Sequence, residues 1–170
     1  YGYKTNENSI SVGTTFQQYE NFYFSPSLLS SFETLETTSK ASNNLKKQKG
    51  DYFDTYFNYG IDYDLTNQRY QPSDGTRTYF AQQLPLVSEQ SEIINTFEVT
   101  KYGTFPSDMV GKISFYSQAA NSLTGDDVRI SKRLYIPYKK LRGFEKGKVG
   151  PKDDNSYIGG NYVSALNLST

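Results

Sequence analysis

The stretch DYFDTYFNYGIDYDL, residues 51–65, decides the fold class, because its residues alternate in chemical character along almost its whole length. Aromatic and apolar side chains dominate the odd-numbered positions, and the even-numbered positions include Asp54, Asp62 and Asp64. Successive side chains of a strand point to opposite faces, so the stretch predicts a strand with one apolar and one acidic, polar face. It is longer than the about 5–6 residues of a typical globular strand and matches the about 9–11 residues that cross a bilayer at a tilt.

Six further segments repeat this alternation with varying clarity, at residues 9–18, 21–36, 76–87, 91–102, 107–119 and 159–170. The chain therefore predicts about seven long strands, and no segment has a convincing helical period. Successive antiparallel strands send their connections to opposite ends of a sheet, so connections 37–50, 87–91 and 123–158 are expected to share one end. Long loops gathered at one end and shorter turns at the other are typical of outer-membrane barrels.

The composition excludes several classes of protein. Hydrophobic residues make up only 35% of the 170 residues, but 16 Tyr and 11 Phe, with 18 basic and 18 acidic residues, do not match a disordered chain. Because Cys and His are both absent, disulfides, thiol chemistry, histidine-based catalysis and the common zinc sites are excluded. The zero net charge and the lack of a known motif also argue against nucleic-acid binding.

Other features argue against an enzyme and for a fragment. The acidic pairs Asp62/Asp64 and Asp153/Asp154 are of the kind a glycosidase uses, but such acids in strands and loops are far more often solvated. We therefore expect no catalytic residues, no metal and no cofactor. The chain begins at Tyr1, has neither a signal peptide nor a long apolar run, and stops within an alternating pattern. We expect it to be one fragment, residues 1–170, of a longer barrel domain.

Three motifs follow one another in the order seen in the BamA family of outer-membrane assembly proteins, the bacterial surface antigen family. The first is a turn before a strand, the second an aliphatic-Arg-Gly-Phe signature followed by Gly-Pro, and the third a Gly-Gly-Asn that opens a strand. Their residues are Asp64, Arg69, Pro72 and Gly75; Leu141, Arg142, Gly143, Phe144, Gly150 and Pro151; and Gly159, Gly160 and Asn161. Both order and spacing resemble that family across the second half of the chain.

The resemblance implies an all-β fold, an antiparallel transmembrane β-barrel of which this chain holds about seven strands from the middle. It implies integral location in the bacterial outer membrane, no nucleotide or metal, and a role in folding and inserting β-barrel proteins there. The implied partners are unfolded outer-membrane protein clients, accessory assembly lipoproteins and outer-membrane lipid. The first and last barrel strands and the periplasmic POTRA domains of that family lie outside this sequence.

The resemblance also implies roles for single residues. The loop at about 123–158 would fold into the lumen, where Arg142 binds acidic groups of the wall, Gly143 permits a tight bend and Phe144 anchors the tip. Without the flanking motifs, Arg142 would simply read as a solvated arginine in a basic loop. Many relatives carry an acidic residue near the position of Ser169, as a candidate partner for the signature arginine. Ser169 itself cannot form an ion pair with Arg142. The turn motif is interpreted as structural, with Asp64 and Arg69 able to bridge its base.

Two interpretations remain open for the basic residues of this loop. They either face anionic lipopolysaccharide or complement an acidic lumen face, unless most are simply solvated. The basic set is Lys132, Arg133, Lys139, Lys140, Lys146 and Lys148, and the acidic face is predicted at Asp54, Asp62, Glu92, Glu98 and Asp108.

Competing functions also remain. A secretion transporter of the TamA or two-partner type would share the signature loop and differ chiefly in its N-terminal domains. A porin-like channel would conduct ions without depending on clients. A soluble carbohydrate-binding β-sandwich would also show alternating strands, but with shorter strands and a more aliphatic inner face.

Overall fold

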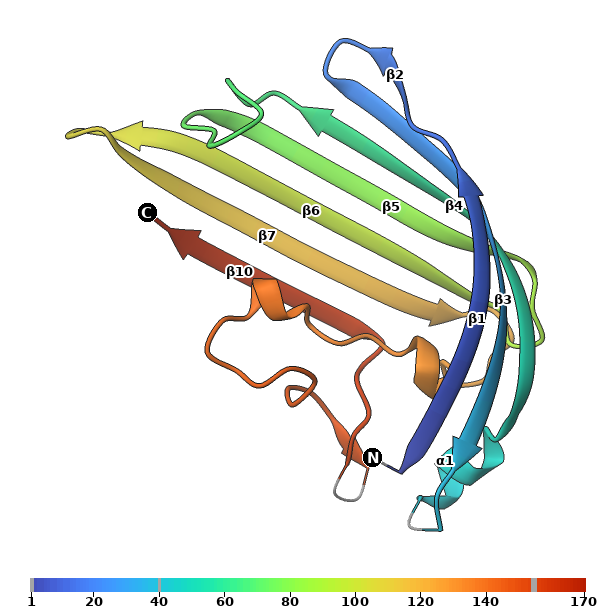
Figure 1. Ribbon diagram of the computed structural model, residues 1–170. Helices are drawn as coiled ribbons and strands as arrows, with labels where there is room; N and C mark the ends of the chain where they lie inside the picture. Colours follow the sequence, from blue (N-terminus) through green and yellow to red (C-terminus); the bar gives the residue numbers. More distant parts are fainter. Residues whose placement is uncertain (1, 40, 154–155) are drawn as a thin grey trace.

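The computed structural model describes residues 2–39, 41–153 and 156–170. One antiparallel sheet dominates it, in the order β1-β3-β4-β5-β6-β7-β10, with the short β2 pairing with β3. Figure 1 shows this sheet curled like part of a barrel wall, with the segment that precedes β10 lying inside the curl. The strands are β1 (Tyr3–Gly13), β2 (Phe16–Tyr19), β3 (Phe22–Thr37), β4 (Gly50–Asp64), β5 (Gly75–Val87), β6 (Glu92–Phe105), β7 (Met109–Ser122) and β10 (Tyr162–Ser169).

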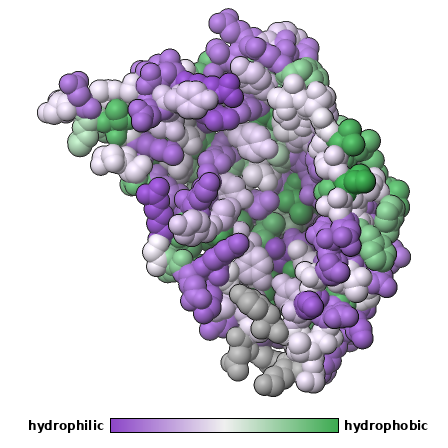
Figure 2. Space-filling model, in the orientation of Figure 1, coloured by the Kyte–Doolittle hydropathy of each residue, from purple (hydrophilic) through white to green (hydrophobic). Residues whose placement is uncertain are grey.

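The two faces of the sheet differ as the alternation predicts. On β4, Phe53 is 54% exposed on the convex face, while the next residue, Asp54, is 1% exposed on the concave face. The register places Phe53 beside Phe32 and Asp54 beside Ser31 of β3, so each face continues from strand to strand. Exposed apolar residues on the convex face recur on β7 and β10, among them Ile113, Phe115, Leu166 and Leu168. Figure 2 shows hydrophobic residues gathered along the outer right side and a largely hydrophilic rim around the central hollow.

The all-β, antiparallel fold class is therefore confirmed. The first strand is an exception to the predicted boundaries, because residues 9–18 are split between β1 and β2, and β1 begins earlier, at Tyr3. Residues 3–8 are polar on both faces, so their strand character leaves no periodic signal. The break after Gly13 follows a close approach to β3, where a Cβ on Gly13 would lie 2.6 Å from Cβ of Ser27.

Little of the described chain is helical. The helical elements are α1 (Asn43–Lys47) and the 3-10 turns η1 (Ile130–Lys132) and η2 (Tyr138–Lys140). A separate pair of short strands is formed by β8 (Lys152–Asp153) and β9 (Ser156–Tyr157). The backbone N–H of Leu45 donates to Oγ of the N-cap residue Ser42 at 3.3 Å, and Leu45 itself is buried. One turn is too short to show a helical period, so its absence from the prediction has a simple cause. Within residues 2–39, 41–153 and 156–170, no helix is long and apolar enough to cross a membrane.

The three connections expected at one end of the sheet do meet there. The backbone N–H of Ile130, in the β7–β10 connection, donates to Oε1 of Gln48, in the β3–β4 connection, at 2.8 Å. Ser88, in the β5–β6 connection, donates through Oγ to Oδ1 of Asp54 at 2.6 Å. A buried apolar cluster joins the β3–β4 and β7–β10 connections to the sheet. Its members are Leu35, Ala41, Leu45, Tyr52 and Ile130. Packing of loops, rather than packing between two sheets, makes the core at this end.

Candidate functional site

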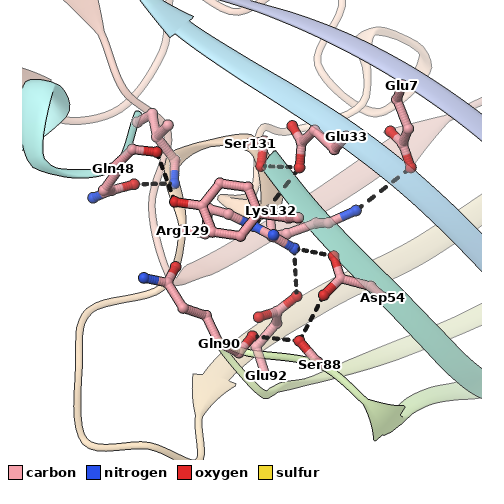
Figure 3. A network of polar contacts seen from close by, with 12 residues as sticks. Glu7, Glu33, Gln48, Asp54, Ser88, Gln90, Glu92, Arg129, Ser131 and Lys132 are labelled. Carbon is pink, nitrogen blue, oxygen red and sulfur yellow. Dashed lines mark hydrogen bonds and ion pairs between the residues drawn. The ribbon is translucent and has the colours of Figure 1, made fainter. Parts of the chain in front are cut away.

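The connection between β7 and β10, residues 123–161 and hereafter the loop, lies against the concave face of the sheet, hereafter the wall. Its most buried charged residue is Arg129, which has no exposed surface. Figure 3 shows the Arg129 side chain reaching from the loop toward carboxylates on the wall. A fully buried arginine is rare unless its charge is paired, so this contact is the centre of the candidate site.

Three carboxylates on three strands surround the Arg129 guanidinium. Nη2 donates a hydrogen bond to Oδ2 of Asp54 on β4. Nε lies 3.7 Å from Oε2 of Glu33 on β3, and Nη2 lies 3.7 Å from Oε1 of Glu92 on β6. The guanidinium carbon also lies 4.2 Å from the centroid of the Tyr52 ring, within the range of a cation–π contact. One loop side chain therefore binds β3, β4 and β6 together.

Each of these carboxylates has a further hydrogen-bond donor. Besides the contact of Asp54 with Ser88, Tyr56 donates through its hydroxyl to Oε1 of Glu92 at 2.6 Å. Ser131 of the loop donates to Oε2 of Glu33 at 2.9 Å. Next to Ser131, Nζ of Lys132 lies 3.6 Å from Oε1 of Glu7 on β1. These extra partners are what a group of buried charges needs in order to be stable.

Arg129 stays charged in this environment. Burial by itself would lower the pKa of its guanidinium, but the hydrogen bond to Asp54 and the charges of Glu92 and Glu33 raise that pKa above its ordinary value. The group is therefore a fixed cation at any physiological pH. Its chemistry is to hold the loop on the wall, not to transfer protons.

A second contact holds the loop farther along the wall. Nζ of Lys140 pairs with Oε1 of Glu98 on β6 and lies 5.5 Å from the centroid of the Tyr116 ring on β7. The Lys140 and Glu98 side chains are 23% and 28% exposed, compared with 0% and 1% for Arg129 and Asp54. Solvent screens this pair, so we expect it to contribute less than the Arg129 contacts.

The signature residues lie just beyond Lys140. Leu141 is half-buried, Gly143 has a φ of +87°, and Phe144 is 60% exposed. Arg142 is exposed, and no hydrogen bond or ion pair of its side chain is found in the part of the chain that the structure describes. Docking of Arg142 in the lumen therefore stays a prediction. The bend predicted at Gly143 matches its positive φ, which favours glycine.

The Gly-Pro and Gly-Gly-Asn motifs hold the two ends of the loop together. Gly150 has a φ of +125° and precedes Pro151, whose carbonyl accepts from the backbone N–H of Ile158 at 3.1 Å. Gly160 exchanges two backbone hydrogen bonds, of 2.8 and 2.9 Å, with the buried Leu134. Two neighbouring residues complete this closure. A Cβ on Gly159 would lie 2.8 Å from the Leu134 carbonyl oxygen, and Asn161 accepts from the N–H of Ala120 of β7 at 2.8 Å.

The turn motif forms a rigid reversal between β4 and β5. Oδ1 of Asp64 accepts from the backbone N–H and the hydroxyl of Thr66 at 3.0 and 2.6 Å, and Oδ2 lies 3.8 Å from Nε of Arg77. Arg69 is exposed, and the ion pair found for Asp64 at the base of the turn is with Arg77. Gly75 has a φ of +106°, and a Cβ there would lie 2.3 Å from the Leu65 carbonyl oxygen. Pro72, which is half-buried, lies between these two ends in the segment that reverses the chain.

The predicted acidic face is largely on the wall. Asp54 and Glu92 contact Arg129, Glu98 pairs with Lys140, and Asp62 pairs with Arg77. Asp108 instead lies in the β6–β7 turn with a φ of +56°. Of the basic loop residues, Lys132 and Lys140 reach the wall, Arg133 and Lys148 pair within the loop with Asp127 and Glu145, and Lys139 and Lys146 are exposed.

Sequence reasoning missed Arg129, the residue at the centre of the site. The available signal was local, because Arg129 lies between Val128 and Ile130 in an otherwise hydrophilic stretch, and a charge flanked by aliphatic residues indicates burial. Ser169 lies on the wall, opposite Lys112 in register. Among the described residues, no group of three or more acidic side chains is arranged to hold a metal ion.

Comparisons with known proteins agree with this architecture. The family described as the Omp85 superfamily domain matches residues 1–168. Among solved structures, the chain is similar to BamA from Haemophilus ducreyi lacking POTRA domains 1–3, with a TM-score of 0.80 and 20% sequence identity. That match covers 98% of this chain and 37% of the other, and at this identity it shows the fold. A search of curated protein sequences found no match.

Proposed function

Because this chain belongs to the Omp85 superfamily, we propose that it forms part of an outer-membrane barrel that folds and inserts β-barrel proteins into the bacterial outer membrane. The single observation that carries the proposal is the loop anchored on the concave wall of a curled antiparallel sheet, together with the BamA-like fold. The chain spans 37% of the length of the BamA chain that it matches. The activity, clients and partners of the whole protein are therefore part of the proposal.

The location follows more directly. Superfamily membership and the curled sheet indicate an outer-membrane β-barrel, and the exposed apolar residues of the convex face are suited to contact lipid. The proposed partners are unfolded outer-membrane protein clients, accessory lipoproteins and outer-membrane lipid. The superfamily assembles or transports proteins without enzymatic chemistry, and we extend this to the present protein, which would act with no catalytic residue or cofactor.

The role of the signature arginine belongs to the same proposal. Arg142 is exposed beside the anchored residue Lys140, so its guanidinium is available for an acidic partner outside the described residues. A bidentate contact with a carboxylate would then fix the tip of the loop in the lumen. Arg142→Ala in the full-length protein should lower barrel stability or assembly activity. Unchanged heat-modifiable gel mobility together with unchanged growth would remove this role.

The experiment that tests the function is depletion of the protein in its host, followed by measurement of outer-membrane protein levels. Loss of many unrelated barrel proteins, restored by re-expression of the full-length protein, would support the assembly role. Loss confined to one or a few secreted proteins, with barrel proteins at normal levels, would instead identify a secretion transporter. A third outcome, ion conductance by the purified protein and normal levels of both, would overturn the proposal in favour of a channel.

A further inference from the structure

We infer that Arg129 and Lys132 form a second anchor for the loop, independent of the signature arginine, and that a row of wall carboxylates requires this anchor. The inference rests on the proposed function only in treating the loop as part of the working barrel. Arg129 and Lys132 are then residues that position this loop on the wall. The acidic row is Glu7, Glu33, Asp54 and Glu92, contributed by β1, β3, β4 and β6.

The acidic row is unfavourable by itself. Glu7 and Glu33 are direct partners in the β1–β3 register, and like charges opposite each other destabilise a strand pair. With the loop docked on the wall, Glu33, Asp54 and Glu92 are each about 1% exposed, so water cannot solvate their charges. Carboxylates buried in this way need cations or donors from the protein. The described strands provide the hydrogen bond from Tyr56, and the β5–β6 connection provides the one from Ser88, but the described strands provide no cation to these three residues.

The loop brings the missing charge. Arg129 contacts Glu33, Asp54 and Glu92, and Lys132, three residues later, contacts Glu7. The 3-10 turn η1 holds both cations on the same side, since it spans Ile130–Lys132 and its N-cap residue is Arg129. Ile130, between them, is buried in the apolar cluster with Leu35 and Leu45. The anchor is thus two cations placed on either side of an apolar contact.

This anchor is separate from the signature. Arg142 lies thirteen positions after Arg129 in the sequence and shares no wall partner with it among the described residues. Among the described residues, the ion pair that this loop makes with the wall between Lys132 and Arg142 is the more exposed pair Lys140–Glu98. The base of the loop is therefore fixed on the wall whether or not Arg142 has found its acidic partner.

The electrostatics make a distinctive prediction. Removing one partner of a buried ion pair leaves an uncompensated charge and is strongly destabilising, whereas replacing both sides with neutral groups is often tolerated. Arg129→Met should therefore release the loop. Combining it with Glu33→Gln, Asp54→Asn and Glu92→Gln should restore the loop to the wall, because the neutral wall no longer needs a cation.

The experiment uses Val128→Cys in the full-length protein in lipid vesicles, with a membrane-impermeant maleimide as the probe. Val128 is 2% exposed, and the 170 residues contain no cysteine, so labelling here reports release of the loop base. We expect Arg129→Met to raise the labelling rate on the order of a hundredfold, and the combined neutral-wall variant to bring the rate back close to its starting value. Lys139→Met, which replaces an exposed lysine of the same loop, is the matched control and should change it less than about threefold.

Several outcomes would overturn the inference. One is an unchanged labelling rate in Arg129→Met, and another is failure of the neutral wall to reverse the increase. A third is an equally large increase in Arg142→Ala, because the two anchors would then not be independent. If Arg129→Met alone does not fold, the combined variant still decides, since the inference requires it to fold and to stay unlabelled. Because labelling needs no client, failure of client assembly with normal labelling would remove the proposed function and leave this inference intact.

Discussion

The hydroxyl of Tyr56 on β4 donates a 2.6 Å hydrogen bond to Oε1 of Glu92 on β6, although β5 lies between these two strands in the sheet. In register, Tyr56 lies opposite Pro85 of β5, and the β5–β6 ladder ends at the pair Gln83–Ile94, so the Tyr56 side chain reaches across β5 to Glu92 at the start of β6. Tyr56 has no exposed surface, and the same Glu92 oxygen faces Arg129. One hydrogen bond thus joins non-neighbouring strands to the anchor of the loop.

Tyr56→Phe should lower the free energy of unfolding by about 1–3 kcal/mol, because Glu92 would remain buried with one donor fewer. The measurement is denaturant unfolding of the full-length protein in lipid vesicles, followed by heat-modifiable gel mobility. Tyr138→Phe is the matched control, since Tyr138 is 64% exposed on the loop and should shift stability by less than about 0.5 kcal/mol. Equal effects of the two substitutions would contradict the role of the Tyr56 hydroxyl.

Gly75→Ala should destabilise the β4–β5 reversal by more than the about 1–2 kcal/mol that a left-handed φ alone costs. The added Cβ would lie 2.3 Å from the Leu65 carbonyl oxygen, so the backbone must also move. Gly125→Ala separates the two effects, because Gly125 has a φ of +83° but nothing within 4 Å of an added Cβ. Refolding yield and unfolding midpoint should both rank Gly75→Ala below Gly125→Ala. The reverse ranking would show that the turn tolerates a shift of Leu65.

Leu45→Ala should cost about 2–5 kcal/mol, the range for a cavity in a packed core. Leu45 is 4% exposed in the cluster that joins α1 to Ile130 of the loop. The exposed Leu123, at 57%, provides the control and should change stability by less than about 0.5 kcal/mol. Limited proteolysis of residues 38–49 should become faster only in Leu45→Ala. Unchanged proteolysis would mean that α1 is held without this cluster.

Phe97→Arg should destabilise the protein by about 2–4 kcal/mol, as for a cation near the middle of a lipid-facing strand. Phe97 is 39% exposed on the convex face and packs against Phe115, with ring centroids 6.5 Å apart. Thr96→Arg, one residue earlier, places the same charge on the concave face and should be better tolerated. The comparison is made in vesicles by the same unfolding measurement. Equal costs would contradict the assignment of the two faces.

Much of the fold was predictable from local pattern. The alternation in residues 51–65 predicted which side chains of β4 face outward, because a strand's two-residue period does not depend on its partners. The turn at Gly75 was likewise predictable, because the backbone conformation there is one that glycine tolerates. The start of β1 was not, since residues 3–8 are polar on both faces and carry no periodic signal.

The site was predicted only in part. The acids Asp54, Glu92 and Glu98 were placed on the inner face, and the basic loop was expected to complement them. The identity of the buried cation was not predictable in this way, because sequence spacing does not say which loop residue comes closest to a given wall residue. Arg129 and Asp54 are 75 positions apart, so only closure of the loop on the sheet brings them together.

By itself, the sequence determined most of the wall strands, their two faces, the end at which the connections gather and the glycine-dependent turns. Each of these follows from the backbone conformation and side-chain direction of a short segment. Only the tertiary structure decided that Arg129, and not the exposed Arg142, is the buried cation on the described wall. Burial of charge depends on which distant carboxylates share a space without water, and that is a property of the folded sheet and its loop together.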